Sequence, residues 1–417
     1  MPENFHIDMP EAVRNIIHTI EEHGFKAYAV GGCIRDSILG RNPDDWDITT
    51  SAVPSQIKTF FKRTVDTGIA HGTVTIMIDK TGYEVTTYRI DGEYEDGRHP
   101  KSVEFSDRLV DDLCRRDFTI NAMAYNDTDG FVDEFKGLDD LDAKIIRCVG
   151  EPELRFTEDA LRMMRAIRFS AQLGFTIDEA TWNAIKKLSP SISKISMERV
   201  HVELGKTLMS AHPDYVAQYS EAGLFAPILP VIDNALKSRY KRKILATLQH
   251  TPDNIYLRYA ALFITSTPDE AAKTLRALKL DNKTVDTVSK LVELSKMDIE
   301  ETEPAVRTAL NKYGRDFLPL WHELMMAVIQ ASEDITGISN PAKVKHLLTL
   351  KRLATDILAR GDCFTIKDLD ITGVDLIEYG LKGAEIGNTL NTLLDIVIEN
   401  PKLNDKATLI ALLDNLK

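Results

Sequence analysis

The sequence predicts an α+β protein in which a small mixed sheet forms an N-terminal head and helices form the rest. Two observations support this prediction. Short β-branched and aromatic runs, separated by Gly and Asp turns, occur within residues 1–150. From Thr157 to Lys417, apolar residues recur at helical spacing, and Pro or Gly marks the loops. Strands and helices that are segregated along a chain are typical of the α+β class.

The head is expected to begin with a helix, a strand and a glycine turn. Residues 10–23 have apolar side chains at helical spacing and precede Gly24, a residue type common at helix ends. Residues 25–30 form a short apolar strand, and Gly31-Gly32 then opens a helix that runs to Leu39. Four later strands are expected at residues 73–78, 83–89, 131–135 and 144–149, the first two forming a hairpin.

The composition is that of an ordinary soluble globular protein, with 43% hydrophobic and 28% charged residues in a chain of 417. No apolar run approaches the roughly 18 residues of a membrane span, and residues 1–10 do not resemble a signal peptide. The four cysteines form no Cys-x-x-Cys pair, which argues against a zinc site or disulfides and favours a cytoplasmic location. The net charge of −13 argues against a general nucleic-acid coat protein, but a local basic surface could still bind one RNA.

The strongest local signal is a glycine turn followed by two carboxylates. Gly32 lies where a strand passes into a helix, so a triphosphate could approach the backbone and meet free N–H groups. Arg35 adds a positive charge one turn later. Asp45 and Asp47 flank one residue of an extended segment and therefore point to the same side. Two such carboxylates can hold Mg²⁺ ions that bridge nucleotide phosphates and an attacking hydroxyl.

Each part of this signal also has a simpler explanation. Gly31-Gly32 alone is a turn, and residues 44–47 alone are an acidic loop next to Pro43. Their order, their spacing and the elements that carry them favour the functional interpretation. The chain contains no Gly-x-x-x-x-Gly-Lys-[Ser/Thr] sequence, so the glycine turn is not a P-loop.

Four ordered motifs resemble those of the class II tRNA nucleotidyltransferases, the family of CCA-adding enzymes and bacterial poly(A) polymerases. They are VGGCIRDSILG at 30–40 with DWDITT at 45–50, EVTTYR at 84–89, RRDFTIN at 115–121 and EDALR at 158–162. The motifs extend over a third of the chain, in the region expected to form the head and the first helices. Four motifs in this order make a specific match.

The resemblance implies a domain plan and a set of site residues. The expected domains are a polymerase-β-like nucleotidyltransferase head at 1–150, a helical neck at 151–210, a helical body at 211–335 and a tRNA-binding tail at 336–417. Asp45 and Asp47 would be catalytic and hold Mg²⁺. The expected nucleotide-binding residues are Gly32, Arg35, Arg116, Asp159, Arg162, Arg165 and Arg168. The arginines at 115 and 116 could instead be a surface pair near the acids at 111 and 112.

A third carboxylate is expected near the first two, because two carboxylates hold a metal less securely than three. Glu84, on the second strand of the predicted hairpin, is the favoured candidate. Asp117 is the alternative, although an Asp directly before Phe118 would also be a good helix N-cap. The sequence leaves this choice open.

The base-reading prediction rests on a helix at residues 158–168. At about 100° per residue, Asp159 and Arg162 would lie about 60° apart and could face one base edge together. A carboxylate accepts from the amino group of C or A, and a guanidinium donates to the adjacent ring nitrogen, whereas U and G present the opposite pattern. The alternative is an ordinary salt bridge. Arg168 would lie on the opposite side of this helix from Asp159 and could support neighbouring structure instead, whereas Arg165 could reach a phosphate.

Three further segments bear on the substrate. The polar loop at 91–100 resembles the flexible loop of full CCA-adding enzymes and favours a switch from C to A. Basic residues at 237–243 could contact RNA phosphates or form a solvated helix face. Residues 340–346 and 351–352 form a second basic stretch. The glycines at 380–387 resemble the start of a helix in the family's tail. His322-Glu323 is not the signature of a phosphohydrolase, so no such domain is expected.

The resulting hypothesis is addition of C, C and A to the 3′ end of tRNA from CTP and ATP, with release of pyrophosphate. The nearest alternative is a poly(A) polymerase or an enzyme restricted to C or A, and a more distant one is a non-catalytic RNA-binding protein. Membrane association and a protein partner are not expected.

Overall fold

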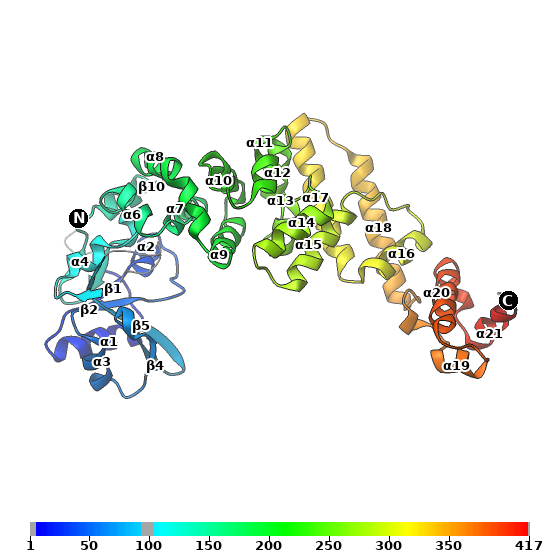
Figure 1. Cartoon of the computed structure of the whole chain (residues 1–417), viewed down its shortest axis with the longest axis horizontal. Coiled ribbons are helices and arrows are strands. Elements are labelled where there is room, and N and C mark those ends of the chain that lie inside the picture. The colour runs from blue at the N-terminus through cyan, green and yellow to red at the C-terminus, as the bar shows by residue number, and fades with distance from the viewer. Residues whose placement is uncertain (1–5, 93–102, 416–417) are drawn as a thin grey trace. The chain divides into compact units, whose positions relative to one another are not determined.

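The computed structural model describes residues 6–92 and 103–415. The chain forms two compact units, Met1–Asp233 and Asn234–Lys417 (Figure 1). The first unit contains a mixed sheet and the second is helical, so the predicted α+β class is confirmed. No helix in the described ranges is both long and apolar enough to cross a lipid bilayer. The finer division near residues 150, 210 and 335 remains a prediction.

The head is built on a seven-stranded sheet in the order β3-β4-β5-β2-β1-β8-β9. Its strands are β1 Ala27–Val30, β2 Ile48–Thr50, β3 Thr64–Gly68, β4 Thr73–Ile78, β5 Thr81–Thr87, β8 Ala124–Asn126 and β9 Gly130–Val132. β2 and β5 run parallel, and all other neighbours are antiparallel. β6 Arg89–Asp91 pairs with β7 Val103–Phe105, and β10 Ile145–Ile146 pairs with β11 Thr176–Ile177.

The predicted hairpin is confirmed as β4 and β5. Asp79 and Lys80 connect the strands with φ values of 47° and 70°, as the right-handed strand twist requires of a two-residue turn. The strand expected at 131–135 is shorter and begins one residue earlier. The strand expected at 144–149 is reduced to two residues.

Helices surround the sheet and extend beyond it in the first unit. They are α1 Glu11–Glu22, α2 Gly32–Ile38, α3 Pro54–Phe60, α4 Leu109–Cys114, α5 Gly137–Asp142, α6 Pro152–Glu158, α7 Leu161–Leu173, α8 Glu179–Leu188, α9 Met197–Leu208 and α10 Ala217–Glu221. The apolar positions that predict α1, namely Val13, Ile16, Ile17 and Ile20, are all buried, and α1 packs against β1. α11, Pro230–Lys237, contains the boundary between the units.

The second unit consists of helices, as predicted. They are α12 Lys241–His250, α13 Ile255–Leu262, α14 Pro268–Ala277, α15 Asn282–Leu294, α16 Glu303–Tyr313, α17 Phe317–Thr336, α18 Pro341–Arg360, α19 Gly373–Glu378, α20 Ala384–Glu399 and α21 Lys406–Asn415. α20 begins directly after Gly383, whose φ of +56° turns the chain into the helix. This confirms the helix start predicted from the glycines.

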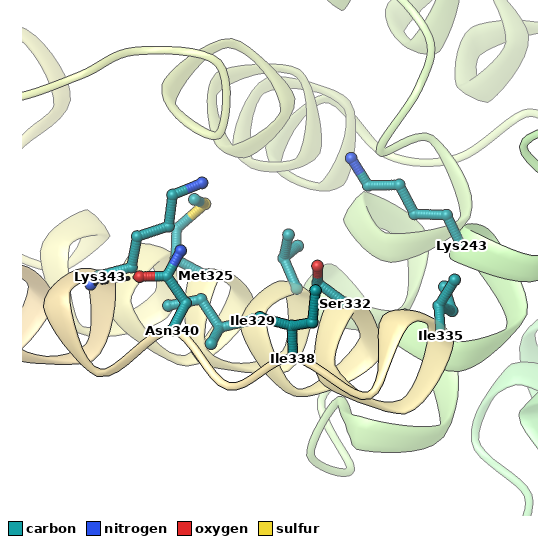
Figure 2. Close-up of a pocket in the computed structure, with 9 residues that line it drawn as sticks. Lys243, Met325, Ile329, Ser332, Ile335, Ile338, Asn340 and Lys343 are labelled. Carbon is teal, nitrogen blue, oxygen red and sulfur yellow. Dashed lines mark hydrogen bonds between the residues drawn. The ribbon is translucent and has the colours of Figure 1, made fainter.

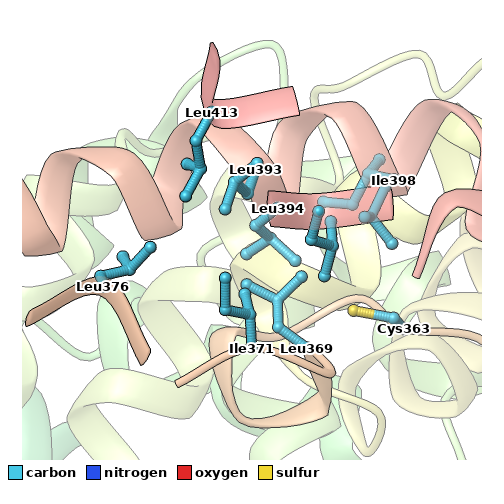
Figure 3. Close-up of a cluster of buried hydrophobic side chains, with 10 residues drawn as sticks. Cys363, Leu369, Ile371, Leu376, Leu393, Leu394, Ile398 and Leu413 are labelled. Carbon is cyan, nitrogen blue, oxygen red and sulfur yellow. The ribbon is translucent and has the colours of Figure 1, made fainter. Parts of the chain in front are cut away.

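The end of the chain has a hydrophobic core of its own (Figure 3). Leu376 of α19, Leu393 of α20 and Leu409 of α21 are fully buried in this cluster. Arg307 of α16 ties α20 to the rest of the unit, because its guanidinium donates to the carbonyl of Ile398 at 2.5 Å. The helices at the C-terminus are therefore anchored by apolar packing and by a buried arginine.

Candidate active site

The glycine turn lies between β1 and α2, as the sequence predicts. Gly31 has a φ of +85°, a conformation that side-chain-bearing residues rarely adopt. A Cβ atom on Gly31 would also lie 2.9 Å from Nη1 of Arg116. The turn therefore needs glycine for its backbone, and a side chain at this position would displace the guanidinium of Arg116. Gly32 and Arg116, two of the predicted nucleotide-binding residues, thus lie at the same turn.

The two predicted catalytic carboxylates lie just before β2. Trp46 between them is buried, whereas Asp45 and Asp47 are exposed, which agrees with their expected position on one side of the segment. Neither carboxylate forms an ion pair with any residue in the described parts of the chain. Crowding by protein atoms raises the pKa of Asp47, the charge of Arg116 opposes this rise, and Asp45 adds to it. The pair is a concentration of unneutralised negative charge.

A hollow of about 530 Å³ joins these elements. Among the predicted site residues, its walls include Gly32, Arg35, Asp45, Asp47 and Arg168. The hollow has the size expected of a small-molecule site, in the range of about 300–1,000 Å³. These five residues thus line one cavity, although they come from three places: α2, the loop before β2, and α7.

Arg35 is buried beside this hollow, and its guanidinium is already engaged. Nε and Nη2 donate to the carboxylate of Asp36 at 3.0 and 2.7 Å, and Nη1 donates to Oδ1 of Asn121 at 2.6 Å. Asp36 therefore neutralises much of the charge that the sequence offers as a phosphate ligand. These hydrogen bonds hold the Arg35 side chain in a fixed orientation, so it forms part of the cavity wall as well as carrying a positive charge.

Asp117, one candidate for the third carboxylate, is buried and fully engaged. Its Oδ2 accepts a hydrogen bond from Nε of Arg165 at 2.7 Å, and its Oδ1 accepts from the amide nitrogens of Phe118 and Asn121. Burial alone would raise the pKa of Asp117, but Arg165 and the hydrogen bonds outweigh burial and lower it to about 2. The helix it was expected to cap is a single 3-10 turn, Thr119–Asn121.

Glu84, the other candidate, lies next to the catalytic pair across the sheet. In the parallel pairing of β2 with β5, Ile48 is opposite Val85, so the residues that precede them, Asp47 and Glu84, are also neighbours. Burial raises the pKa of Glu84, and the charges of Asp47 and Asp45 raise it further. The sheet register and the charge interaction both favour Glu84 over Asp117 as the third acid.

Replacement of Asp117 by Asn is expected to destabilise the protein at neutral pH. The folded-state pKa of about 2 lies below the unfolded value of about 4, so the carboxylate contributes stability above about pH 4 that is lost as the pH falls towards 2. The expected loss in free energy of unfolding is about 2–3 kcal/mol at pH 7, measured by urea denaturation. Asp142→Asn, at an exposed site in α5, is the control and should change little. Equal stability of Asp117→Asn and the wild type at pH 7 would contradict this role.

The prediction of one continuous helix at 158–168 is wrong. α6 ends at Glu158, Asp159 has extended backbone angles (φ −144°, ψ 104°), and α7 begins at Leu161. The carboxylate of Asp159 accepts a hydrogen bond from the backbone N–H of Leu161 at 3.0 Å. Such a local side-chain bond competes with helical hydrogen bonding, which explains the break. The expected angle between Asp159 and Arg162 therefore does not apply.

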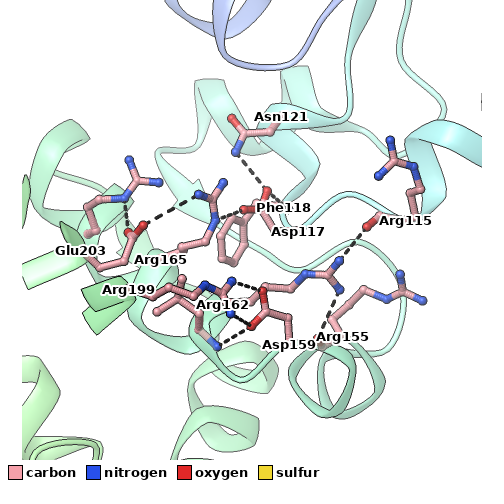
Figure 4. Close-up of polar contacts among 12 residues, drawn as sticks. Arg115, Asp117, Phe118, Asn121, Arg155, Asp159, Arg162, Arg165, Arg199 and Glu203 are labelled. Atoms are coloured by element: carbon pink, nitrogen blue, oxygen red, sulfur yellow. Dashed lines mark hydrogen bonds and ion pairs between the residues drawn. The ribbon is translucent and has the colours of Figure 1, made fainter. Parts of the chain in front are cut away.

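Asp159 and Arg162 each have a structural partner (Figure 4). The carboxylate of Asp159 accepts from both terminal nitrogens of Arg199, on α9, at 3.3 and 2.7 Å. Nη1 of Arg162 lies 2.5 Å from Glu158, and Nη2 donates to the backbone carbonyl of Arg115 at 3.0 Å. The two predicted base-reading groups are thus held in place from different directions.

The predicted residues Arg165 and Arg168 share a buried carboxylate. Nε of Arg168 lies 2.6 Å from Glu203 of α9, and Nη1 of Arg165 lies 3.9 Å from the same side chain. The guanidinium of Arg168 also lies over the ring of Phe169, 3.8 Å from its centroid. These contacts agree with the alternative that Arg168 supports neighbouring structure, while it also lines the hollow.

Sequence reasoning missed Arg199 and Glu203. Both lie on α9, with Arg199 lying 40 residues after Asp159 in the chain, and neither belongs to a recognisable local pattern. The available signal is the presence of charged residues on an amphipathic helix, which also fits a solvated face. The loop predicted at 91–100 lies, except for residues 91 and 92, outside the described residues.

In the second unit, one lysine from each of the two basic stretches lies at a hollow of about 310 Å³ (Figure 2). Lys243 comes from α12 and Lys343 from the first turn of α18. Ile329 and Ile338 provide part of its apolar lining. Two basic segments that are a hundred residues apart in sequence therefore meet at one surface.

Together, the mixed sheet, the glycine turn and the carboxylate pair define a nucleotidyltransferase. A family model described as the Poly A polymerase head domain matches residues 27–147, and one for tRNA nucleotidyltransferase domain 2 matches residues 254–413. Between them, residues 174–236 match a model described as a probable RNA and SrmB-binding site of polymerase A.

Full-length relatives specify the family. A CCA-adding enzyme of Pediococcus pentosaceus is 34% identical over 425 residues, covering 100% of this chain and 99% of the relative. One of Limosilactobacillus fermentum is 38% identical, with coverages of 96% and 95%. The chain belongs to the CCA-adding enzyme family.

Solved structures agree with this assignment. The Bacillus stearothermophilus CCA-adding enzyme in complex with CTP has a TM-score of 0.75 at 32% identity, covering 97% of this chain and 96% of that one. A Thermotoga maritima CCA-adding enzyme complexed with tRNA has a TM-score of 0.62 at 20% identity, over 99% of this chain and 97% of that one, and shows a shared fold.

Proposed function

We propose that this protein adds C, C and A to the 3′ end of tRNA, using CTP and ATP and releasing pyrophosphate. The observation that carries the proposal is that Asp45 and Asp47, two carboxylates without an ion-pair partner in the described chain, line the same hollow as the Gly32 turn. The naming of full-length relatives as CCA-adding enzymes supports this substrate. The reaction would take place in the cytoplasm, in agreement with four cysteines that form no disulfide.

The donor set suits Mg²⁺. This ion prefers carboxylate oxygens and is usually held by one or two carboxylates together with substrate phosphates. Asp45 and Asp47 would supply the protein ligands, with Glu84 as a third acid close by. The described parts of the chain contain no group of three or more His, Cys, Asp or Glu side chains that could hold a metal ion. When bound, the metal would neutralise charge that develops on the phosphates.

The chain's own residues would position the reactants. The turn at Gly32 admits the phosphates next to the backbone, and Arg116 lies against that turn. The tRNA 3′-hydroxyl would then release its proton to solvent, and its oxygen would bond to the α-phosphorus as the bond from this phosphorus to the bridging oxygen breaks. The reaction needs no template strand if the protein recognises the incoming base itself.

Asp159 and Arg162 would recognise that base. The carboxylate would accept from the amino group of C or A, and the guanidinium would donate to the neighbouring ring nitrogen. Arg199 and Glu158 hold these two side chains, so their orientation would be set before the nucleotide binds. Lys243 and Lys343 would contact tRNA phosphates from the second unit.

The test offers the purified protein, with Mg²⁺, each labelled nucleoside triphosphate and three tRNAs that end before CCA, after C and after CC. The expected result is incorporation of C, C and A in that order, followed by a stop. Long A tails would establish the alternative poly(A) polymerase, which one matching family model names in its description. Incorporation of C alone would establish a restricted enzyme, and no incorporation a non-catalytic RNA-binding protein.

A further inference from the structure

Three arginines line the hollow of the active site, and two of them are neutralised by protein carboxylates. Arg35 pairs with Asp36 at 2.7 Å, and Arg168 lies 2.6 Å from Glu203. The third, Arg41, is exposed and forms no ion pair with any residue in the described ranges. Arg41 is therefore the cation of this cavity that is available to a ligand.

The backbone brings Arg41 to the cavity in a defined way. Gly40 lies just after α2 and has a φ of +69°, a left-handed conformation that cannot continue the helix. The backbone N–H of Arg41 then donates to the carbonyl of Asp36 at 2.8 Å, which fixes the start of its side chain. The same loop continues to Asp45 and Asp47. Arg41 and the catalytic carboxylates therefore belong to one short segment and line the same cavity.

The charge balance of the cavity indicates what Arg41 would bind. Besides Asp36, three acids line the hollow: Asp44, Asp45 and Asp47. A nucleoside triphosphate adds further negative charge, most of it on its β- and γ-phosphates. A planar guanidinium can donate two parallel hydrogen bonds to phosphate oxygens, and such bonds strengthen as charge accumulates on a leaving group.

We infer that Arg41 binds the β- and γ-phosphates of the incoming nucleotide and the pyrophosphate that leaves. The inference rests on the proposed function. During transfer, the tRNA 3′-hydroxyl releases its proton to solvent, its oxygen forms a bond to the α-phosphorus, and the bond from this phosphorus to the bridging oxygen breaks. The pyrophosphate keeps the electron pair of the broken bond, and Arg41 donates hydrogen bonds to its oxygens.

The test compares Arg41→Gln and Arg41→Lys with Arg63→Gln. Arg63 is an exposed arginine of the head outside the hollow, so its variant serves as the matched control. Binding of CTP with Mg²⁺ and without tRNA is measured directly, as is inhibition of incorporation by pyrophosphate. Arg41→Gln should weaken both by roughly tenfold or more, with partial recovery in Arg41→Lys. Binding of CMP, which lacks the β- and γ-phosphates, and the KM for tRNA should stay unchanged.

Two outcomes would overturn the inference while leaving the proposed function intact. In one, Arg41→Gln binds CTP and pyrophosphate as the wild type does, and incorporation remains normal. In the other, only the KM for tRNA rises, which would assign Arg41 to the terminal phosphate of the tRNA. If the wild type itself neither bound CTP nor incorporated nucleotide, both the inference and the proposed function would be wrong.

Discussion

Replacement of Asp47 by Ala is expected to reduce nucleotide incorporation by roughly a thousandfold or more. The variant loses one of three carboxylates that line the hollow without an ion-pair partner in the described chain, and with it a proposed metal ligand. A metal contributes several kcal/mol to stabilising the charge of a phosphoryl-transfer transition state, and each 1.4 kcal/mol is about a factor of ten in rate. The measurement is the single-turnover rate of CTP incorporation into a tRNA that ends before CCA.

The control for this experiment is an exposed acid of the head outside the hollow. Asp142, at the end of α5, is exposed and is not part of the cavity lining. Asp142→Ala should keep most of the activity, and both variants should bind tRNA as the wild type does. If Asp47→Ala still incorporated nucleotide at a comparable rate, the metal assignment would be wrong. If tRNA binding were also lost, the effect would reflect misfolding.

The head could be predicted from the sequence because its determinants are local. The hairpin of β4 and β5 follows from two β-branched runs and a turn at Asp79 and Lys80. The carboxylate pair and the glycine turn lie within twenty residues of each other, so their relation depends on one strand, one helix and one loop. Local spacing was sufficient to place both in one cavity.

The sequence favours Glu84 as the third carboxylate but leaves Asp117 as an alternative, because the arrangement of these acids depends on sheet register. Nothing in the sequence reveals that β2 pairs in parallel with β5 and brings Glu84 next to Asp47. Nor does the sequence reveal that Asp117 is already bound to Arg165. Both facts arise from contacts between segments that are dozens of residues apart.

The sequence indicates which residues could recognise the base, but it does not predict how they are arranged. The periodicity around Asp159 favours a continuous helix, and the break arises because its carboxylate binds the backbone N–H of Leu161 and the guanidinium of Arg199 instead. The first of these contacts is local, but the second comes from α9. Periodicity reports which residues are apolar, and it carries no information about a partner forty residues later.

Replacement of Asp159 by Ala is expected to weaken discrimination between nucleotides by roughly tenfold or more. Removal of the carboxylate deletes the acceptor for the amino group of C or A. It also removes the penalty against U and G, because the carboxylate would remain unpaired opposite either base at a cost of about 1–3 kcal/mol. The measurement is the ratio of kcat/KM for CTP to that for UTP on a tRNA that ends before CCA. Glu153→Ala, which removes an exposed acid of α6, is the control and should leave this ratio unchanged. An unchanged ratio in Asp159→Ala would remove this residue from base recognition.

Arg199 should affect the same ratio only through Asp159. Arg199→Gln would free the carboxylate of Asp159 without removing it, so discrimination should fall by less than in Asp159→Ala. In the double variant, the loss should be no larger than in Asp159→Ala alone, because the arginine then has nothing to position. Additive losses would instead mean that Arg199 contacts the nucleotide or the tRNA directly. A merely structural role would lower the melting temperature without a change in the ratio, which separates positioning of the carboxylate from general support of the fold.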